Sequence, residues 1–436
     1  MVDVTAAGIP VVIGASAIEL EVGLDENNKL GVTVAGAYNY STNVQGGRLG
    51  GLLSLKNELV ADVHKDLNDL ASAIIQQINQ YHVQGVGSSG SFTGLTGWVM
   101  ADEDFADFDP PITNGSVFIR VTDTTVPGTT TITRHEIDIA ANPTLSDFAD
   151  YITNNITGLT ASVASSRLSI SADPNYEFDF LPGVLSDPTT SNLNGDAGSS
   201  IPTVTISGIY TGTETQTYTC TVVGDGEVGN DDDLKIEVRI DTDLIKTLDV
   251  GSYAAGDRLE IGDGIYVSVG TGQLNNGEVF TIEALASSDT SGVLAAVGIN
   301  TFFYGSGASD IAVCSDIAAT PGRVATALGA DMTDNTNALR LAGLRDQAVS
   351  SLGAMTPGEF YHRMITNIGQ QLSVKQMRQD NIEVMVQNLA NQQSETSGVD
   401  INDEAARLLI FEQMFQAMAK YMATIQSTVA ALMAAM

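Results

Sequence analysis

The feature that most constrains this chain is an apolar repeat at the end of the sequence. Its large apolar residues are spaced alternately three and four positions apart, which is typical of the contact seam of a coiled coil. These residues are Leu408, Phe411, Phe415, Met418, Met422, Ile425, Val429, Leu432 and Met436. The sequence therefore predicts a long helix that packs against other helices.

The residues around this seam define where the helix starts and how wide its apolar surface is. Gly398 can end a preceding helix in the left-handed conformation, and Asp400 can act as the N-cap of a new one. Beside the seam, alanine, methionine, tyrosine and threonine replace charges, and after Glu412 only Lys420 is charged. Polar residues interrupt every window of the roughly 20 residues needed to span a membrane. Burial in the core of the same chain is the alternative to packing against other chains.

Length and charge narrow the class of protein further. A chain of 436 residues can form several domains with their own cores. It has 53 acidic and 19 basic residues, so nucleic acid and anionic membranes are not expected partners. No basic residue precedes Lys29, so the start lacks the charged region of a cleavable secretory signal. With only Cys220 and Cys314, a disulfide scaffold is excluded, and we expect both thiols to stay unpaired.

Periodicity predicts a multidomain α+β protein, in which long coiled-coil-like helical segments near the ends enclose inserted β-rich domains. The predicted parts are a β-rich section of a core domain (1–48), a long core helix with its connection (49–100), two β-rich outer domains (101–190 and 191–290), a return to the core domain with a long helix (291–397), and a C-terminal assembly helix (398–436).

Three segments carry this prediction most clearly. A helix is expected over 49–82, with an apolar stripe that includes Val60, Leu67 and Ile74. A short helix is expected near 145–156, with Ser146 as its cap. The stretch "LKIEVRID" (234–241) alternates apolar and polar residues, which is typical of a strand with one buried face.

Sequence motifs give little support for catalysis. Two matches to the dinucleotide-binding fingerprint, 85–90 and 224–229, do not lie between a strand and a helix, and we interpret both as turns. The acidic stretch 225–233 lacks EF-hand spacing, because Ile236 stands where the last ligand should be. We interpret it as a solvated turn, with a calcium site as the alternative. No catalytic, cofactor-binding or metal residue is predicted, and an enzyme is not expected.

Several segments nevertheless resemble one protein family. The end of the chain, 397–429, resembles the C-terminal motif of flagellar axial proteins, most closely the hook-associated FlgK family of the hook–filament junction. The segments 46–85, 294–313 and 334–344 are similar to further parts of that family, and 145–172 resembles a small β insert of flagellin-like proteins. Members of the family begin with an apolar helix and an asparagine-rich motif. We expect this sequence to represent the family without that part.

The resemblance implies a structural, non-catalytic junction protein that links hook and filament without any cofactor. It implies terminal helices that pack against neighbouring subunits, with the residues from Leu408 to Leu432 of the seam as assembly contacts. Implied partners are further copies of the chain, the hook protein and other hook-associated proteins, and an export chaperone is allowed. The implied location is the extracellular flagellum, reached without a cleavable signal peptide. The alternatives are another axial protein, either a flagellin or the second junction protein, and a secreted β-rich adhesin or glycan-binding protein.

Overall fold

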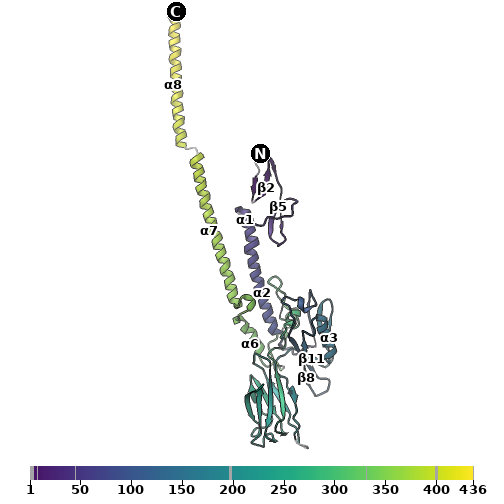
Figure 1. The fold of residues 1–436 in the computed structure, drawn as a ribbon. Coiled ribbons are helices and arrows are strands. Elements are labelled where there is room, and N and C mark those ends of the chain that lie inside the picture. The colour runs from purple at the N-terminus through teal and green to yellow at the C-terminus, as the bar shows by residue number, and fades with distance from the viewer. Residues whose placement is uncertain are drawn as a thin grey trace. The chain divides into compact units, whose positions relative to one another are not determined.

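The computed structural model describes residues 4–6, 8–44, 46–195, 199–329, 331–397 and 401–435. Contacts between residues divide the chain into two compact units, Met1–Met364 and Ile365–Met436. The fold is mixed α+β, with long helices and several small antiparallel sheets, as the periodicity predicted (Figure 1). Gly398 and Asp400, which were expected to separate the two last helices, lie outside the described residues.

The first unit begins with short antiparallel strands. Three of them form a sheet in the order β1–β2–β3 and two form the hairpin β4–β5. Their bounds are β1 Val4–Ala6, β2 Ile9–Ile13, β3 Ser16–Ala17, β4 Leu20–Leu24 and β5 Leu30–Val34. A helical stretch follows, made of α1 (Gly47–Ser54), the π-helical turn η1 (Leu55–Leu59) and α2 (Val60–His82). The predicted helix over 49–82 is therefore confirmed, with a π-helical turn inside it that the sequence did not predict.

The apolar stripe of this helix is buried over only part of its length. Val60 and Leu67, which belong to the stripe, are 44% and 38% exposed. The buried residues of α2 all lie in its second half, from Ala71 to His82. The reason is that the cores of the first unit pack only against the second half of the helix, so apolar spacing in the first half does not lead to burial within this chain.

A first core lies between two three-stranded sheets and one helix. The sheet orders are β6–β10–β9 and β11–β7–β8. The elements are β6 Gly94–Val99, the 3₁₀ turn η2 Phe105–Asp107, β7 Ser116–Asp123, β8 Thr131–Asp138, α3 Leu145–Asn155, β9 Leu159–Val163, β10 Arg167–Ala172 and β11 Tyr176–Asp179. Helix α3 confirms the predicted short helix, but its cap is Thr144 and not Ser146. The Thr144 side chain accepts a hydrogen bond from the Asp147 backbone N–H at 3.1 Å, which leaves Leu145 as the first helical residue.

A second core is entirely β-structured. It combines a five-stranded sheet in the order β12–β21–β14–β16–β17 with the sheet β13–β19–β18 and the pair β15–β20. The strands are β12 Thr190–Ser191, β13 Val204–Gly208, β14 Gln216–Val223, β15 Gly226–Glu227, β16 Lys235–Ile240, β17 Asp243–Asp249, β18 Leu259–Gly262, β19 Ile265–Val269, β20 Gln273–Leu274 and β21 Val279–Ala284. Strand β16 confirms the predicted alternation, because Ile236 and Val238 are fully buried while Lys235 is exposed.

The chain then returns to the first core. Apolar residues of α4 (Val293–Val297) pack in the same cluster as residues of α3 and β7. The remaining short elements are β22 Phe303–Tyr304, β23 Ala312–Val313, α5 Ser315–Ala319, η3 Pro321–Arg323, α6 Thr336–Gly343, η4 Leu344–Asp346 and η5 Ser350–Leu352. The first core therefore uses residues from both sides of the second core along the chain. The domain boundaries proposed from the sequence stay a prediction.

Two long helices complete the chain, α7 (Pro357–Ser397) and α8 (Ile401–Ala434). Helix α7 starts with a reciprocal cap in which Thr356 and Glu359 each accept the other's backbone N–H through the side chain. Phe360 is 3% exposed and packs in a small cluster with Ala73 and Leu352, which holds the start of α7 in the first unit.

Buried polar side chains join the end of α2 to distant segments. The His82 ring pairs through Nδ1 with the Asn300 carbonyl at 2.7 Å, and its Nε2 accepts the Ala325 N–H at 3.0 Å. Since Nε2 accepts, the proton is on Nδ1 and the ring is neutral. The Asn300 amide donates to the carbonyls of His82, Val83 and Gly85, which satisfies acceptors left open where the helix ends.

We expect this junction to weaken in acid. Burial lowers the pKa of His82 from 6.5 to about 4, so the unfolded chain binds a proton that the folded chain excludes between these values. The contribution of neutral His82 to the free energy of unfolding is complete above pH 6.5. It is lost as the pH falls toward 4, by about 3 kcal/mol at most. Denaturant unfolding across this range should show the loss in the parent chain and in a His64→Gln variant, where the replaced side chain is exposed. An equal loss in His82→Gln would contradict this assignment.

Candidate assembly interface

Helix α8 forms as the apolar repeat predicted. It runs without interruption from Ile401 to Ala434, and Asp403 and Glu404 lie in its first turn, where the helix dipole favours negative charge. The last seam residue, Met436, lies outside the described residues. The eight seam residues from Leu408 to Leu432 therefore lie on one helix with the spacing of a coiled-coil contact surface.

None of the eight seam side chains is buried. Their exposed fractions range from 43% for Ile425 to 76% for Phe415. Every residue of α8 whose side chain is described is exposed. Large apolar side chains in water gain nothing from the hydrophobic effect, so this helix carries stabilising free energy that the described structure does not use.

The apolar surface of α8 extends beyond the seam. Leu409, Ile410, Met414, Tyr421 and Met433 lie outside the seam and are also more than half exposed. A helix with one apolar stripe satisfies a single neighbour, whereas a helix that is apolar on most sides needs to be buried on several. The geometry of α8 therefore fits contact with more than one partner helix.

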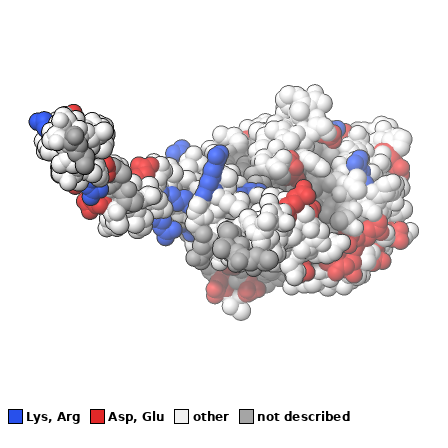
Figure 2. All heavy atoms as spheres, turned by 90° about the horizontal axis from the view of Figure 1, so that it is seen from above, with Lys and Arg blue, Asp and Glu red and all other residues white. Residues whose placement is uncertain are grey.

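Charged groups contribute little to this surface. Arg407 pairs with Glu404 at 3.2 Å near the start of the helix, and both side chains are more than half exposed. Exposed pairs of this kind contribute about 0–1 kcal/mol. Figure 2 shows acidic side chains gathered on one part of the visible surface, in keeping with the formal charge of -34. The described surface of α8 is therefore mainly apolar, and charge pairing adds little to it.

The motifs that could have indicated catalysis have structural roles. In the stretch 85–90, a side chain at Gly87 would overlap the carbonyl oxygens of Gly322 and Val324. The glycine is needed because two backbone segments come close together there. Neither match lies between a strand and a helix, although the second one, 224–229, contains the short strand β15 and is not only a turn. Among the described residues, no group of three or more His, Cys, Asp and Glu side chains is arranged to hold a metal ion.

The acidic stretch 225–233 uses its side chains locally. Asp231 accepts the backbone N–H of Glu227 at 2.6 Å, and Asn230 donates to the Glu227 carboxylate at 2.9 Å. Asp232 accepts a hydrogen bond from Ser252 at 2.9 Å. These bonds hold a tight turn, which agrees with its interpretation as a solvated turn.

Both cysteines are free thiols. Cys220 is fully buried in the second core, and burial raises its pKa to about 12. Burial also raises the pKa of Cys314, which is half-buried. Because the thiolate is the reactive form, neither residue is set up as a nucleophile.

In the part of the chain that is described, none of the helices has both the length and the apolar character required to cross a membrane.

Comparison with known proteins finds a family match at the start of the chain. Residues 1–96 match the family model of the flagellar hook-associated protein FlgK helical domain. Over these residues the chain is similar to FlgK-family proteins. The family consists of structural components of the flagellum and not of enzymes. This match agrees with the resemblance stated from the sequence for the segment 46–85.

Two other comparisons add less. The solved structure of the flagellar hook junction protein FlgK from Burkholderia pseudomallei is 15% identical, with a TM-score of 0.33, over 90% of this chain and 74% of that one. Curated proteins gave no match. The similarity to the FlgK family thus rests on the amino-terminal match, whereas the seam residues stay predicted assembly contacts.

Exposure of the seam predicts an unusual contrast between two phenylalanines. Phe148 is fully buried in the first core, so Phe148→Ala should lower the free energy of unfolding by about 3–5 kcal/mol. Phe415 is 76% exposed, so Phe415→Ala in dilute monomer should change it by less than about 0.5 kcal/mol. Urea unfolding of both variants measures the difference. Equal losses would show that α8 is already buried against its own chain.

Proposed function

We propose that this protein is an adaptor between the hook and the filament of the flagellum, and that it works through helix packing with neighbouring axial subunits. The observation that carries the proposal is the apolar surface of α8, on which every described side chain is exposed and none is buried. Similarity to the FlgK family supplies the class of partner, which is the set of flagellar axial proteins.

The energetics favour assembly over an isolated helix. A single helix in water is marginal, because nucleation is costly and most helix stability in proteins comes from packing. Each large side chain of the seam would contribute on the order of 1.5–3 kcal/mol when fully buried. Eight such residues on one helix outweigh the cost of ordering only when partner helices cover them. The seam residues Leu408, Phe411, Phe415, Met418, Met422, Ile425, Val429 and Leu432 are the proposed contacts.

The proposed mechanism is interface geometry. Coupling a flexible segment to a stiff one requires a subunit whose helices fit both neighbours. The apolar surface on several sides of α8 would allow it to contact each of them. The two β-containing cores close their own apolar faces, so they can project from the assembly without depending on it. The proposed partners are further copies of the chain, the hook protein and other hook-associated proteins. The proposed location is the extracellular flagellum, reached by export without a cleavable signal.

Charge in the seam should abolish assembly. Phe415→Asp combined with Met422→Asp places two carboxylates in a surface that must become dry, which is strongly unfavourable. We expect this variant to stay monomeric in sedimentation equilibrium, where the parent chain associates, and to fail to attach filaments in cells that carry it in place of their own copy.

The matched control places the same two charges elsewhere on α8. Gln413 and Ser427 lie opposite the seam in the heptad spacing, so Gln413→Asp with Ser427→Asp should leave association and filament attachment intact. Circular dichroism should show that the β-containing cores fold in both variants. The proposal is wrong if both double variants behave alike.

A further inference from the structure

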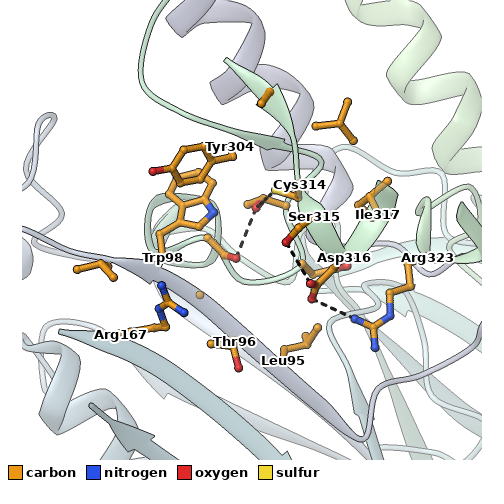
Figure 3. Close-up of a pocket in the computed structure, with 17 residues that line it drawn as sticks. Leu95, Thr96, Trp98, Arg167, Tyr304, Cys314, Ser315, Asp316, Ile317 and Arg323 are labelled. Carbon is orange, nitrogen blue, oxygen red and sulfur yellow. Dashed lines mark hydrogen bonds and ion pairs between the residues drawn. The ribbon is translucent and has the colours of Figure 1, made fainter. Parts of the chain in front are cut away.

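An open pocket lies in the first unit, far along the chain from the assembly seam. Its volume is about 500 Å³, within the range of small-molecule and peptide sites. One wall is strand β6, of which all residues from Leu95 to Val99 line the pocket. The opposite wall is the segment from Ala312 to Ile317, which contains β23 and the start of α5 (Figure 3). The sequence analysis did not predict this pocket.

Both walls present backbone that can accept another strand. Strand β6 is at the edge of the sheet β6–β10–β9, so only one of its sides is paired within the described residues. Strand β23 pairs only with β22. An unpaired strand edge is a template for a further extended chain. The length of β6 that lines the pocket matches an extended peptide better than a compact ligand.

The aromatic groups of the pocket are fixed in place. Trp98 and Tyr304 meet edge to face, with ring centroids 5.6 Å apart. A side chain at Gly298 would overlap the Trp98 ring, so one face of the indole lies against this backbone. Thr301 contacts the Cys314 sulfur at 3.4 Å on the same wall. The backbone at Gly298 therefore covers one face of the Trp98 indole.

The positive charge in the pocket favours peptides that carry a carboxylate. Arg167 lies on β10 opposite Val99, lines the pocket and is exposed. Within the described residues its guanidinium makes no ion pair, although the chain has 53 acidic residues. Arg323, at the other end of the pocket, is paired with Asp316 at 3.2 Å (Figure 3). Arg167 is therefore the cation that remains available to a carboxylate of the ligand.

We propose that this pocket binds an extended acidic peptide segment of a partner protein, which adds to the open edge of β6 and places a carboxylate on Arg167. Backbone hydrogen bonds to β6 supply most of the affinity, and Arg167 and the Trp98–Tyr304 corner select the side chains. This inference goes beyond assembly through α8 and does not depend on it.

Trp98 makes the test direct, because it is the single tryptophan of the chain. The probes are capped hexapeptides of alternating threonine and valine, in which one glutamate is moved through each position in turn. With the full chain, we expect at least one of them to change Trp98 fluorescence saturably, with a dissociation constant below about 1 mM. The same peptide with lysine in place of glutamate should bind about tenfold more weakly. Methylation of alternate backbone nitrogens should abolish binding, because it removes the donors needed for strand pairing.

Variants separate the charge from the strand edge. Arg167→Gln should weaken the glutamate peptide about tenfold and leave a glutamine version of the peptide unchanged. Arg345→Gln is the matched control, because Arg345 is 89% exposed and lies outside the pocket. Unchanged affinity in Arg167→Gln would overturn the role of charge. Equal binding of the methylated peptide, or no saturable response from any probe, would overturn the site.

Discussion

The interaction on which this structure depends is one that the described chain does not make by itself. Helix α8 carries a continuous seam and further apolar residues beside it, and the described structure buries none of them. The free energy of burying such a surface is large and has no direction of its own, so it acts wherever another apolar helix is available. The first unit has its own buried cores, and α7 begins in it and leads along the chain to this helix.

That attachment depends on a few well-satisfied polar and apolar contacts. Phe360 packs beside Ala73 where α7 begins, and His82 with Asn300 fixes the end of α2 against distant loops. In the first core, Arg120 and Asp179 form a buried ion pair at 2.6 Å, in which the carboxylate accepts further hydrogen bonds. A buried pair costs desolvation energy, but with its acceptors satisfied it fixes one arrangement of the strands.

Local periodicity allowed much of the fold to be predicted. The α8 seam, the helix over 49–82 and the alternation of β16 follow directly from spacing. Errors arose where tertiary contacts decide. Thr144 caps α3 in place of Ser146, and Val60 is exposed although it follows the helical apolar spacing. The Trp98 pocket could not be predicted, since it joins β6 to residues about two hundred positions away in the sequence, and spacing carries no signal of that meeting.

Amide hydrogen exchange tests the central claim most directly. If the α8 surface is reserved for other subunits, amides from Leu408 to Leu432 should exchange fast in a demonstrated monomer, because an isolated helix opens readily. The same amides should become strongly protected when the protein associates with axial subunits. Strong protection across this helix in the monomer would contradict the account, because it would show that α8 already has a partner within its own chain.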